Sequence, residues 1–108
     1  MSGQEATSYD GREESRAYRL EGRVQGVGFR WWSSREGDSL GVRGWVRNLP
    51  DGGVELHAAG PSEALDELEA RLRRGPGGAR VSDLQQTGAG EDLPEEGFEI
   101  RPTPGRGW

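Results

Sequence analysis

The chain has 108 residues, a formal net charge of −5, 31% hydrophobic and 31% charged residues, and no cysteine. This length suits one domain with a modest core, and the composition excludes a disulfide framework, thiolate metal sites and a centre built on several histidines, since His57 is the only histidine. No apolar stretch approaches the ~20 residues of a membrane span, and residues 1–16 lack the apolar core of a secretory signal. We therefore expect a cytoplasmic protein without membrane contact.

The acidic balance argues against general nucleic-acid binding, because that affinity rests on neutralising phosphates with basic side chains. All 14 basic residues are arginines, whose planar fork can hold a phosphate or carboxylate at two points. A GC-rich genome would explain the bias equally well, so each arginine must be judged from its own motif.

Three regions differ in composition. Residues 1–15 are polar and lack hydrophobic periodicity, which predicts a disordered N-terminal tail. Residues 16–102 carry the periodic segments and are expected to form the domain. Residues 103–108 are rich in glycine and proline and predict a flexible C-terminal tail.

The first half of the domain predicts a strand, a turn and a helix. Apolar and polar residues alternate over 18–24, as in a strand with one buried face. A turn with two glycines follows at 25–28, and a helical pattern over 29–40 ends at Gly41. Gly37 lies on the apolar face of this helix, which indicates a close approach to another element.

The middle of the domain predicts a hairpin and a second helix. Alternating segments at 42–46 and 54–58 flank a Pro-Asp-Gly turn. The next helix opens at Pro61 and Ser62, buries leucines spaced at i, i+3 and i+7, and stops at Gly75.

Two short segments complete the pattern: Val81 with Leu84 indicates a fourth strand, and Phe98 with Ile100 a fifth. The order is β-α-β-β-α-β with a short extra strand in the last connection. This order predicts an α+β, ferredoxin-like sandwich, in which an antiparallel sheet carries two helices on one face and leaves the other face open.

The turn before the first helix has the chemistry of an anion site. Successive N–H groups that lead into a helix N-terminus bind anions, and glycines let the anion approach the backbone. Arg30 stands where the turn meets the helix and could close on the same anion. An ordinary connection with Arg30 as a capping residue is the alternative. Nucleotide motifs do not fit, because the chain has no lysine and Trp31 replaces the third glycine of GxGxxG.

Two further polar residues lie on the hairpin. Asn48, just before the Pro-Asp-Gly turn, is either a turn-forming asparagine or a side chain that holds a water at the edge of an anion pocket. His57 is expected on the outward, solvent-exposed side of the third strand, not as a catalytic base.

These segments resemble the two signatures of the acylphosphatase family. Leu20 to Arg30, LEGRVQGVGFR, is similar to the first signature. Gly44 to Asn48, GWVRN, with the glycines and valine that follow at 52, 54 and 60, is similar to the second. The resemblance spans about residues 15–102, and the family's βαββαβ sandwich agrees with the predicted fold. Gly37, where a small helix former is usual, and the long N-terminal tail depart from the family pattern.

The resemblance implies hydrolysis of an acyl phosphate to a carboxylate and inorganic phosphate, which would then compete with the substrate. Arg30 matches the family's phosphate-binding arginine, and Asn48 matches the asparagine that positions the attacking water. The implied phosphate-binding loop comprises Gln25, Gly26, Val27, Gly28, Phe29 and Arg30. No metal or cofactor is implied, and a monomer is expected.

Two other functions remain open at this point. An RNA-binding module on the same fold is disfavoured, because Val46 stands where Gly or Ala is needed and the net charge is negative. A catalytically silent anion sensor would use Arg30 without turnover. A phosphate-release assay on acetyl or benzoyl phosphate separates both from an enzyme.

Overall fold

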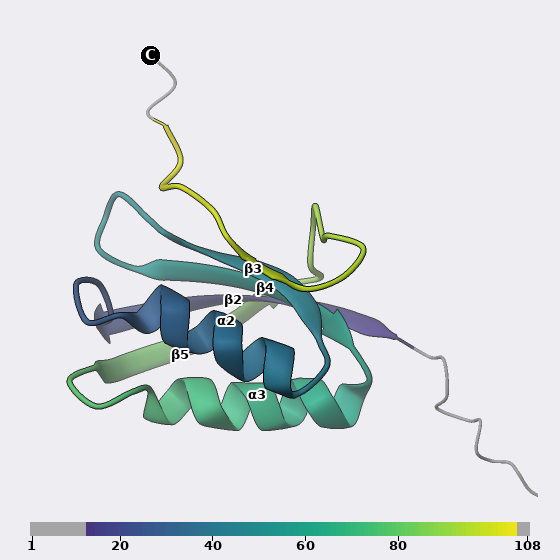
Figure 1. Ribbon diagram of the computed structural model, residues 1–108. Coiled ribbons are helices and arrows are strands. Elements are labelled where there is room, and N and C mark those ends of the chain that lie inside the picture. Colours follow the sequence, from purple (N-terminus) through teal and green to yellow (C-terminus); the bar gives the residue numbers. More distant parts are fainter. Residues whose placement is uncertain (1–12, 106–108) are drawn as a thin grey trace, which may run out of the picture.

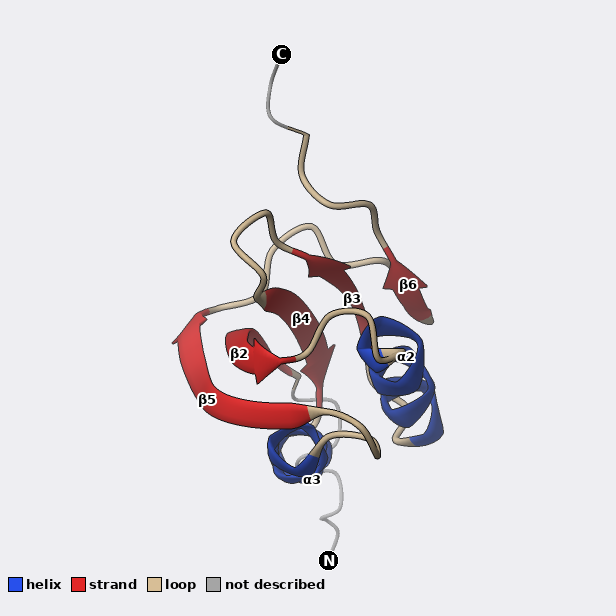
Figure 2. Cartoon of the chain, turned by 90° about the vertical axis from the view of Figure 1, so that its left-hand side faces the viewer, coloured by secondary structure: helices blue, strands red, loops and turns tan. Residues whose placement is uncertain are grey.

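The computed structural model describes residues 13–105 (Figure 1). Its elements, in chain order, are strand β2 (Glu14–Arg23), helix α2 (Phe29–Ser39), strand β3 (Arg43–Asn48), strand β4 (Val54–Gly60), helix α3 (Ser62–Arg74), strand β5 (Arg80–Gly88) and strand β6 (Phe98–Ile100). Figure 2 shows α2 and α3 on the same side of the sheet. Neither described helix is long and apolar enough to cross a membrane.

The five strands form one sheet in the order β5-β2-β4-β3-β6. The α+β ferredoxin-like class is confirmed, with one correction to the predicted antiparallel sheet. The β2–β4, β2–β5 and β3–β4 pairs are antiparallel, but β6 runs parallel to β3. After β5, residues 89–97 return the chain along the sheet before β6 begins, so the fifth strand joins the β3 edge in the same direction as β3.

The sheet begins slightly earlier than the sequence predicts. Glu14 pairs with Gly60 and Ser15 with Ala59, so the end of the predicted tail belongs to β2. Residues 1–12 of that tail, and 106–108 at the other end, lie outside the described residues. Residues 103–105 are described without helix or strand.

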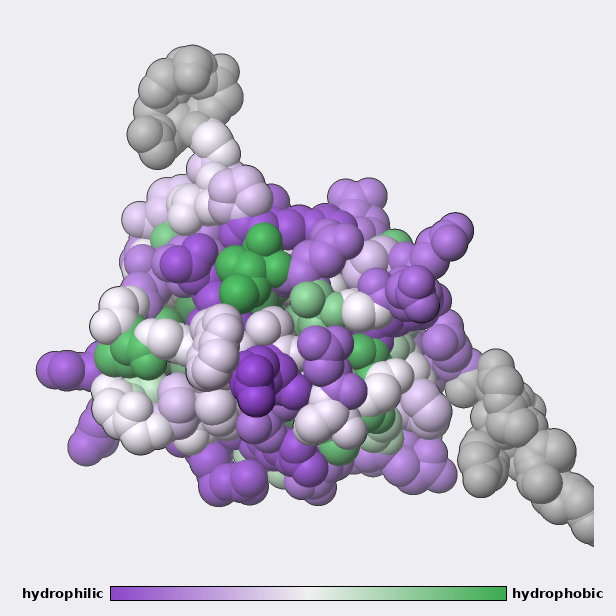
Figure 3. Space-filling model, viewed as in Figure 1, coloured by the Kyte–Doolittle hydropathy of each residue, from purple (hydrophilic) through white to green (hydrophobic). Residues whose placement is uncertain are grey.

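The hydrophobic core lies between the sheet and the two helices. The leucines of α3 that the i, i+3, i+7 spacing selects are fully buried, as are the inward residues of β2, β3 and β4. The core cluster comprises Tyr18, Leu20, Val24, Phe29, Val42, Val46, Val54, Leu56, Ala58, Leu65, Leu68, Leu72 and Leu84. The face of the molecule in Figure 3 is mostly hydrophilic, with small separate apolar patches.

The predicted close approach at Gly37 is confirmed, and its partner is Phe98 of β6. A Cβ at Gly37 would lie 2.4 Å from the Phe98 ring, and a Cβ at Gly44 would lie 2.8 Å from the same ring and 2.1 Å from the carbonyl oxygen of His57. Both positions therefore exclude a side chain, and the two glycines let Phe98 fix β6 between α2 and β3.

The prediction that His57 is solvent-exposed is wrong. The residue points away from the helices but is only 5% exposed, because Trp45 stacks on its ring at 4.1 Å and the β5–β6 connection covers this part of the sheet. Nδ1 accepts the N–H of Glu91 at 2.9 Å, so Nε2 carries the hydrogen and donates to Glu55. The face that was expected to be open is therefore partly covered.

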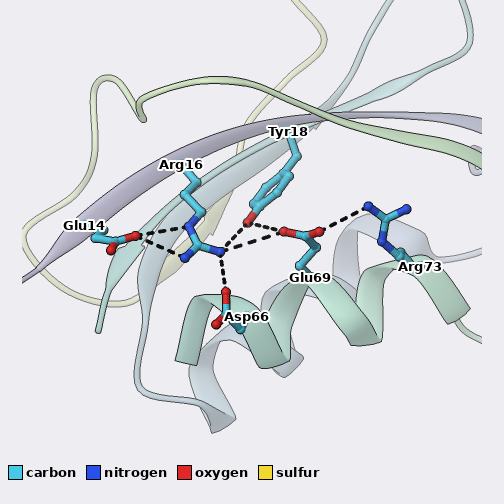
Figure 4. A network of polar contacts seen from close by, with 6 residues as sticks. All are labelled: Glu14, Arg16, Tyr18, Asp66, Glu69 and Arg73. Atoms are coloured by element: carbon cyan, nitrogen blue, oxygen red, sulfur yellow. Dashed lines mark hydrogen bonds and ion pairs between the residues drawn. The ribbon is translucent and has the colours of Figure 1, made fainter. Parts of the chain in front are cut away.

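A polar network joins β2 to α3 (Figure 4). Its members are Glu14, Arg16, Tyr18, Asp66, Glu69 and Arg73. The Arg16 guanidinium lies 2.9 Å from Asp66, and the Tyr18 hydroxyl donates to Glu69 at 3.2 Å. Burial raises the pKa of Tyr18, and Arg16 partly opposes this effect. Every charged group of the network has an opposite charge beside it.

Candidate active site

The loop between β2 and α2 has the backbone conformation that an anion cradle requires. Gly26 and Gly28 have φ values of 76° and 77°, which side-chain-bearing residues rarely adopt. A Cβ at either position would meet no atom within 4 Å. The glycines are therefore needed for conformation, and the space beside them is open to a ligand.

The start of α2 adds backbone donors to this loop. Gly28 is the N-cap, and its carbonyl accepts the N–H of Trp32 at 2.9 Å as the first helical hydrogen bond. The N–H groups of the first helical turn have no acceptor inside the helix, so they can bind an anion. The first turn of α2 contains no acidic residue that would repel one.

The side chain of Gln25 fastens this loop to the β3–β4 turn. Its Nε2 donates to the carbonyl oxygens of Leu49 at 2.9 Å and Gly53 at 2.8 Å. Figure 1 shows the two connections at the same end of the sheet. The family resemblance implies that Gln25 belongs to the phosphate-binding loop, but it assigns no contact to this side chain. A polar side chain in a glycine turn gives no indication of a partner 24 or 28 residues away, so the sequence carried no signal for this contact.

A pocket of about 160 Å³ opens between the loop, β3 and β6. The structure brings together five of the predicted site residues here: Gly26, Gly28, Phe29, Arg30 and Asn48. The other lining residues are Val24, Trp31 and Ile100. Gln25 and Val27 are not in the lining, and the Phe29 side chain is buried in the core, 1% exposed. Any ligand contact of Phe29 would therefore be through its backbone.

Arg30 is half-buried in the pocket wall and makes no ion pair with any residue from 13 to 105. Seven of the other described arginines pair with carboxylates, whereas Arg23, Arg35, Arg74 and Arg80, like Arg30, do not. Within residues 13–105, the Arg30 guanidinium is thus a positive charge beside the loop without a carboxylate partner.

Asn48, the last residue of β3, carries an unsatisfied acceptor. Its Oδ1 is buried without a hydrogen-bond partner, the one such side-chain atom within the described residues. A buried acceptor without a partner costs about 1–3 kcal/mol, and native proteins contain few such atoms. The β3–β4 turn is closed by other groups, through the bonds Leu49 N–H to Gly53 and Gly53 N–H to Asp51. This arrangement favours a ligand-facing role for Asn48 over the turn-forming alternative.

The described residues contain no group of three His, Asp or Glu side chains placed to hold a metal ion. The pocket lining itself supplies one cation, one carboxamide, backbone amides and apolar side chains. This set can bind an anion and hold a water molecule next to it.

A ferredoxin-like fold with a pocket lined by a glycine-containing loop, an arginine and an asparagine defines a small α+β protein, and comparison with known proteins specifies its family. A family model described as Acylphosphatase matches residues 16–100. The acylphosphatase of Koribacter versatilis is 42% identical over 106 residues, covering 92% of this chain and 96% of that protein. That of Alkalilimnicola ehrlichii is 46% identical over 87 residues, covering 81% and 97%.

A solved structure agrees. The crystal structure of acylphosphatase from Bacillus subtilis superposes with a TM-score of 0.73 at 35% identity, covering 81% of this chain and 97% of that chain. The chain belongs to the acylphosphatase family. Family and fold together support hydrolysis of acyl phosphates.

Proposed function

We propose that the chain hydrolyses acyl phosphates to a carboxylate and inorganic phosphate in the pocket that Arg30 and Asn48 share. The observation that carries this proposal is their convergence: a guanidinium and an amide oxygen, neither with a partner among residues 13–105, line one pocket beside a glycine-containing loop. The first group suits a phosphate and the second suits a water.

In the proposed complex, the phosphate of the substrate lies against the loop. The backbone N–H groups of residues 25–30 donate to its oxygens, and the Arg30 fork neutralises its charge at two points. Gln25 holds the loop in register with the β3–β4 turn through its two carbonyl contacts. The distance between the phosphate and Asn48 is therefore set by a hydrogen-bonded frame.

The proposed chemistry is direct attack of a water on phosphorus. The water donates a hydrogen bond to Oδ1 of Asn48, forms a bond to phosphorus, and passes its proton to a phosphate oxygen as the bond from phosphorus to the acyl oxygen breaks. The products are a carboxylate and dihydrogen phosphate, so the atoms balance. The carboxylate leaves without a general acid, because its conjugate acid has a pKa of only ~4–5.

A site this sparse suffices because phosphoryl transfer passes through a loose transition state. The water is then only weakly bonded to phosphorus, and a strong base is not needed. Positioning and charge stabilisation supply most of the catalysis. We infer that the reaction needs no metal ion.

The test is phosphate release from acetyl phosphate and benzoyl phosphate by the full chain, with excess chelator and with added Mg²⁺. Turnover should continue in chelator, and inorganic phosphate should inhibit competitively because product and substrate share the loop. Absence of turnover with intact phosphate binding would identify a silent anion sensor instead. Loss of activity in chelator, with recovery in Mg²⁺, would overturn the metal-independent mechanism. Cytoplasmic location and a monomeric state stay predictions.

A further inference from the structure

The exposed apolar side chains of this protein gather at one place. Among the described residues, the large hydrophobic side chains that are exposed are Trp31, at 61%, and Ile100, at 45%. Both line the pocket of Arg30 and Asn48, although they come from different elements, the first turn of α2 and the end of β6. Scattered exposed apolar residues need no explanation, but two that meet at the rim of one pocket indicate a contact with a ligand.

We propose that Trp31 and Ile100 form an acyl-group subsite, which selects acyl phosphates whose acyl group is apolar and planar. This inference rests on the proposed function. A phosphate held by the loop and Arg30 leaves the acyl group on the opposite side of the bridging oxygen, away from the backbone amides. The other apolar side chains of the lining, Val24 and Phe29, are buried, each 1% exposed. The acyl group therefore meets Trp31 and Ile100.

The Trp31 ring and the backbone of Ile100 are held in place before a ligand arrives. The Arg35 guanidinium lies 4.8 Å from the centre of the Trp31 ring, one helical turn along α2, and this cation–π contact restrains the indole. Ile100 pairs with Val46 in the parallel register, and the next residue along donates its N–H to the Val46 carbonyl at 2.9 Å. A preorganised wall of this kind loses little conformational entropy on binding.

The chemistry of the wall favours a flat apolar group. An indole offers a planar face on which an aromatic ring stacks, and the isoleucine adds aliphatic surface from a second direction. A methyl group, as in acetyl phosphate, covers little of either. In an enclosed pocket one methylene changes kcat/KM about 10- to 200-fold, so a half-open wall that contacts a whole ring should contribute about 10-fold.

The experiment measures kcat/KM for benzoyl phosphate and acetyl phosphate with the wild type, Trp31→Ala, Trp31→Phe and Ile100→Thr. Trp31→Ala should lower kcat/KM for benzoyl phosphate about 10-fold and leave acetyl phosphate within about 2-fold. Ile100→Thr should act in the same direction with a smaller effect, and Trp31→Phe should keep most of the preference. The inhibition constant of inorganic phosphate should stay constant in all variants, because the cradle is untouched.

An equal ratio of the two kcat/KM values in wild type, Trp31→Ala and Ile100→Thr would overturn the subsite and leave the hydrolase intact. A parallel loss for both substrates in Trp31→Ala would also overturn it, because the residue would then act on the phosphate site. If the wild type turned over neither benzoyl phosphate nor acetyl phosphate, the proposed function itself would be contradicted. The acetyl phosphate measurement thus separates the two failures.

Discussion

Two arginines differ in their surroundings: Arg16 lies near the start of β2, and Arg30 lies at the start of α2. The Arg16 guanidinium contacts the carboxylates of Glu14, Asp66 and Glu69 (Figure 4). Arg30, at the start of α2, pairs with none of residues 13–105 and lines a pocket with an unsatisfied Asn48 oxygen. Among residues 13–105, Arg16 is thus paired within the protein, whereas Arg30 has no carboxylate partner and lines a pocket.

The comparison separates stability from function. Contacts in the Arg16 network are made on folding and contribute to the free energy of unfolding. The pocket contributes little on folding, and the buried Asn48 oxygen costs about 1–3 kcal/mol until it is satisfied. Such local costs are typical of functional sites. Substitutions in the Arg16 network should therefore change the free energy of unfolding, and substitutions in the pocket should change the kinetics.

Arg30→Ala should have the largest effect on activity. Without the fork, kcat/KM for acetyl phosphate should fall about 10³-fold or more, the scale of a charge that stabilises a transferring phosphoryl group. The melting temperature should hardly change, because the side chain loses no ion pair with residues 13–105. Arg30→Lys should restore little, since a point charge does not reproduce the fork. The control is Arg74→Ala, which removes an exposed arginine at the end of α3. Near-normal turnover in Arg30→Ala would show that Arg30 does not serve catalysis, and the functional difference from Arg16 would be lost.

Gln25→Ala should affect both stability and activity, because this side chain fastens the proposed phosphate-binding loop to the β3–β4 turn. Two lost hydrogen bonds should lower the free energy of unfolding by about 1–2 kcal/mol. The loosened loop should also reduce kcat/KM about 10-fold. Urea denaturation and steady-state kinetics check the two effects, with Gln85→Ala on the exposed surface of β5 as control. Loss of stability with unchanged kinetics would show that the two Gln25 hydrogen bonds do not position the loop for catalysis.

Arg16→Ala should show the reverse of Arg30→Ala. The substitution leaves a cluster of carboxylates without its cation, and we expect a loss of about 1–2 kcal/mol in the free energy of unfolding, reduced by solvent screening of the exposed partners. The kcat/KM of the folded variant should equal that of the wild type. A kinetic defect in a variant of unchanged stability would mean that the network also serves the site.

The smallest expected effect is a pH dependence at Glu55, which contacts His57 and Arg47. Burial acts to raise the pKa of this carboxyl, but hydrogen bonds from His57 and Arg47 outweigh it and hold the pKa below its ordinary value of 4.5. The stabilisation is therefore complete above pH 4.5 and is lost as the pH falls below it. Unfolding in urea at pH 5.5, 4.5 and 3.5 should show a flatter pH dependence for Glu55→Gln than for the wild type. If the free energy of unfolding depended on pH equally in the wild type and in Glu55→Gln, Glu55 would not contribute to acid stability.

The sequence predicted the features that depend on local pattern. Alternation and helical spacing gave the order of elements, and the glycines at 26 and 28 marked the loop because few other residues adopt its conformation. Contacts between distant segments could not be read in this way. The bonds of Gln25 to the β3–β4 turn, the direction of β6 and the burial of His57 under the β5–β6 connection all depend on where long connections run.

Asn48→Ala tests the central claim most directly, because it separates phosphate binding from chemistry. The measurement is a phosphate titration followed by single-turnover hydrolysis of benzoyl phosphate with the folded variant and the wild type. We predict unchanged phosphate affinity, a free energy of unfolding at least equal to that of the wild type because an unsatisfied buried oxygen is removed, and a single-turnover rate lowered about 10²-fold, the scale of one well-placed polar group at a transition state. A single-turnover rate equal to that of the wild type, with a lowered free energy of unfolding, would contradict the account and leave Asn48 as a residue of the turn.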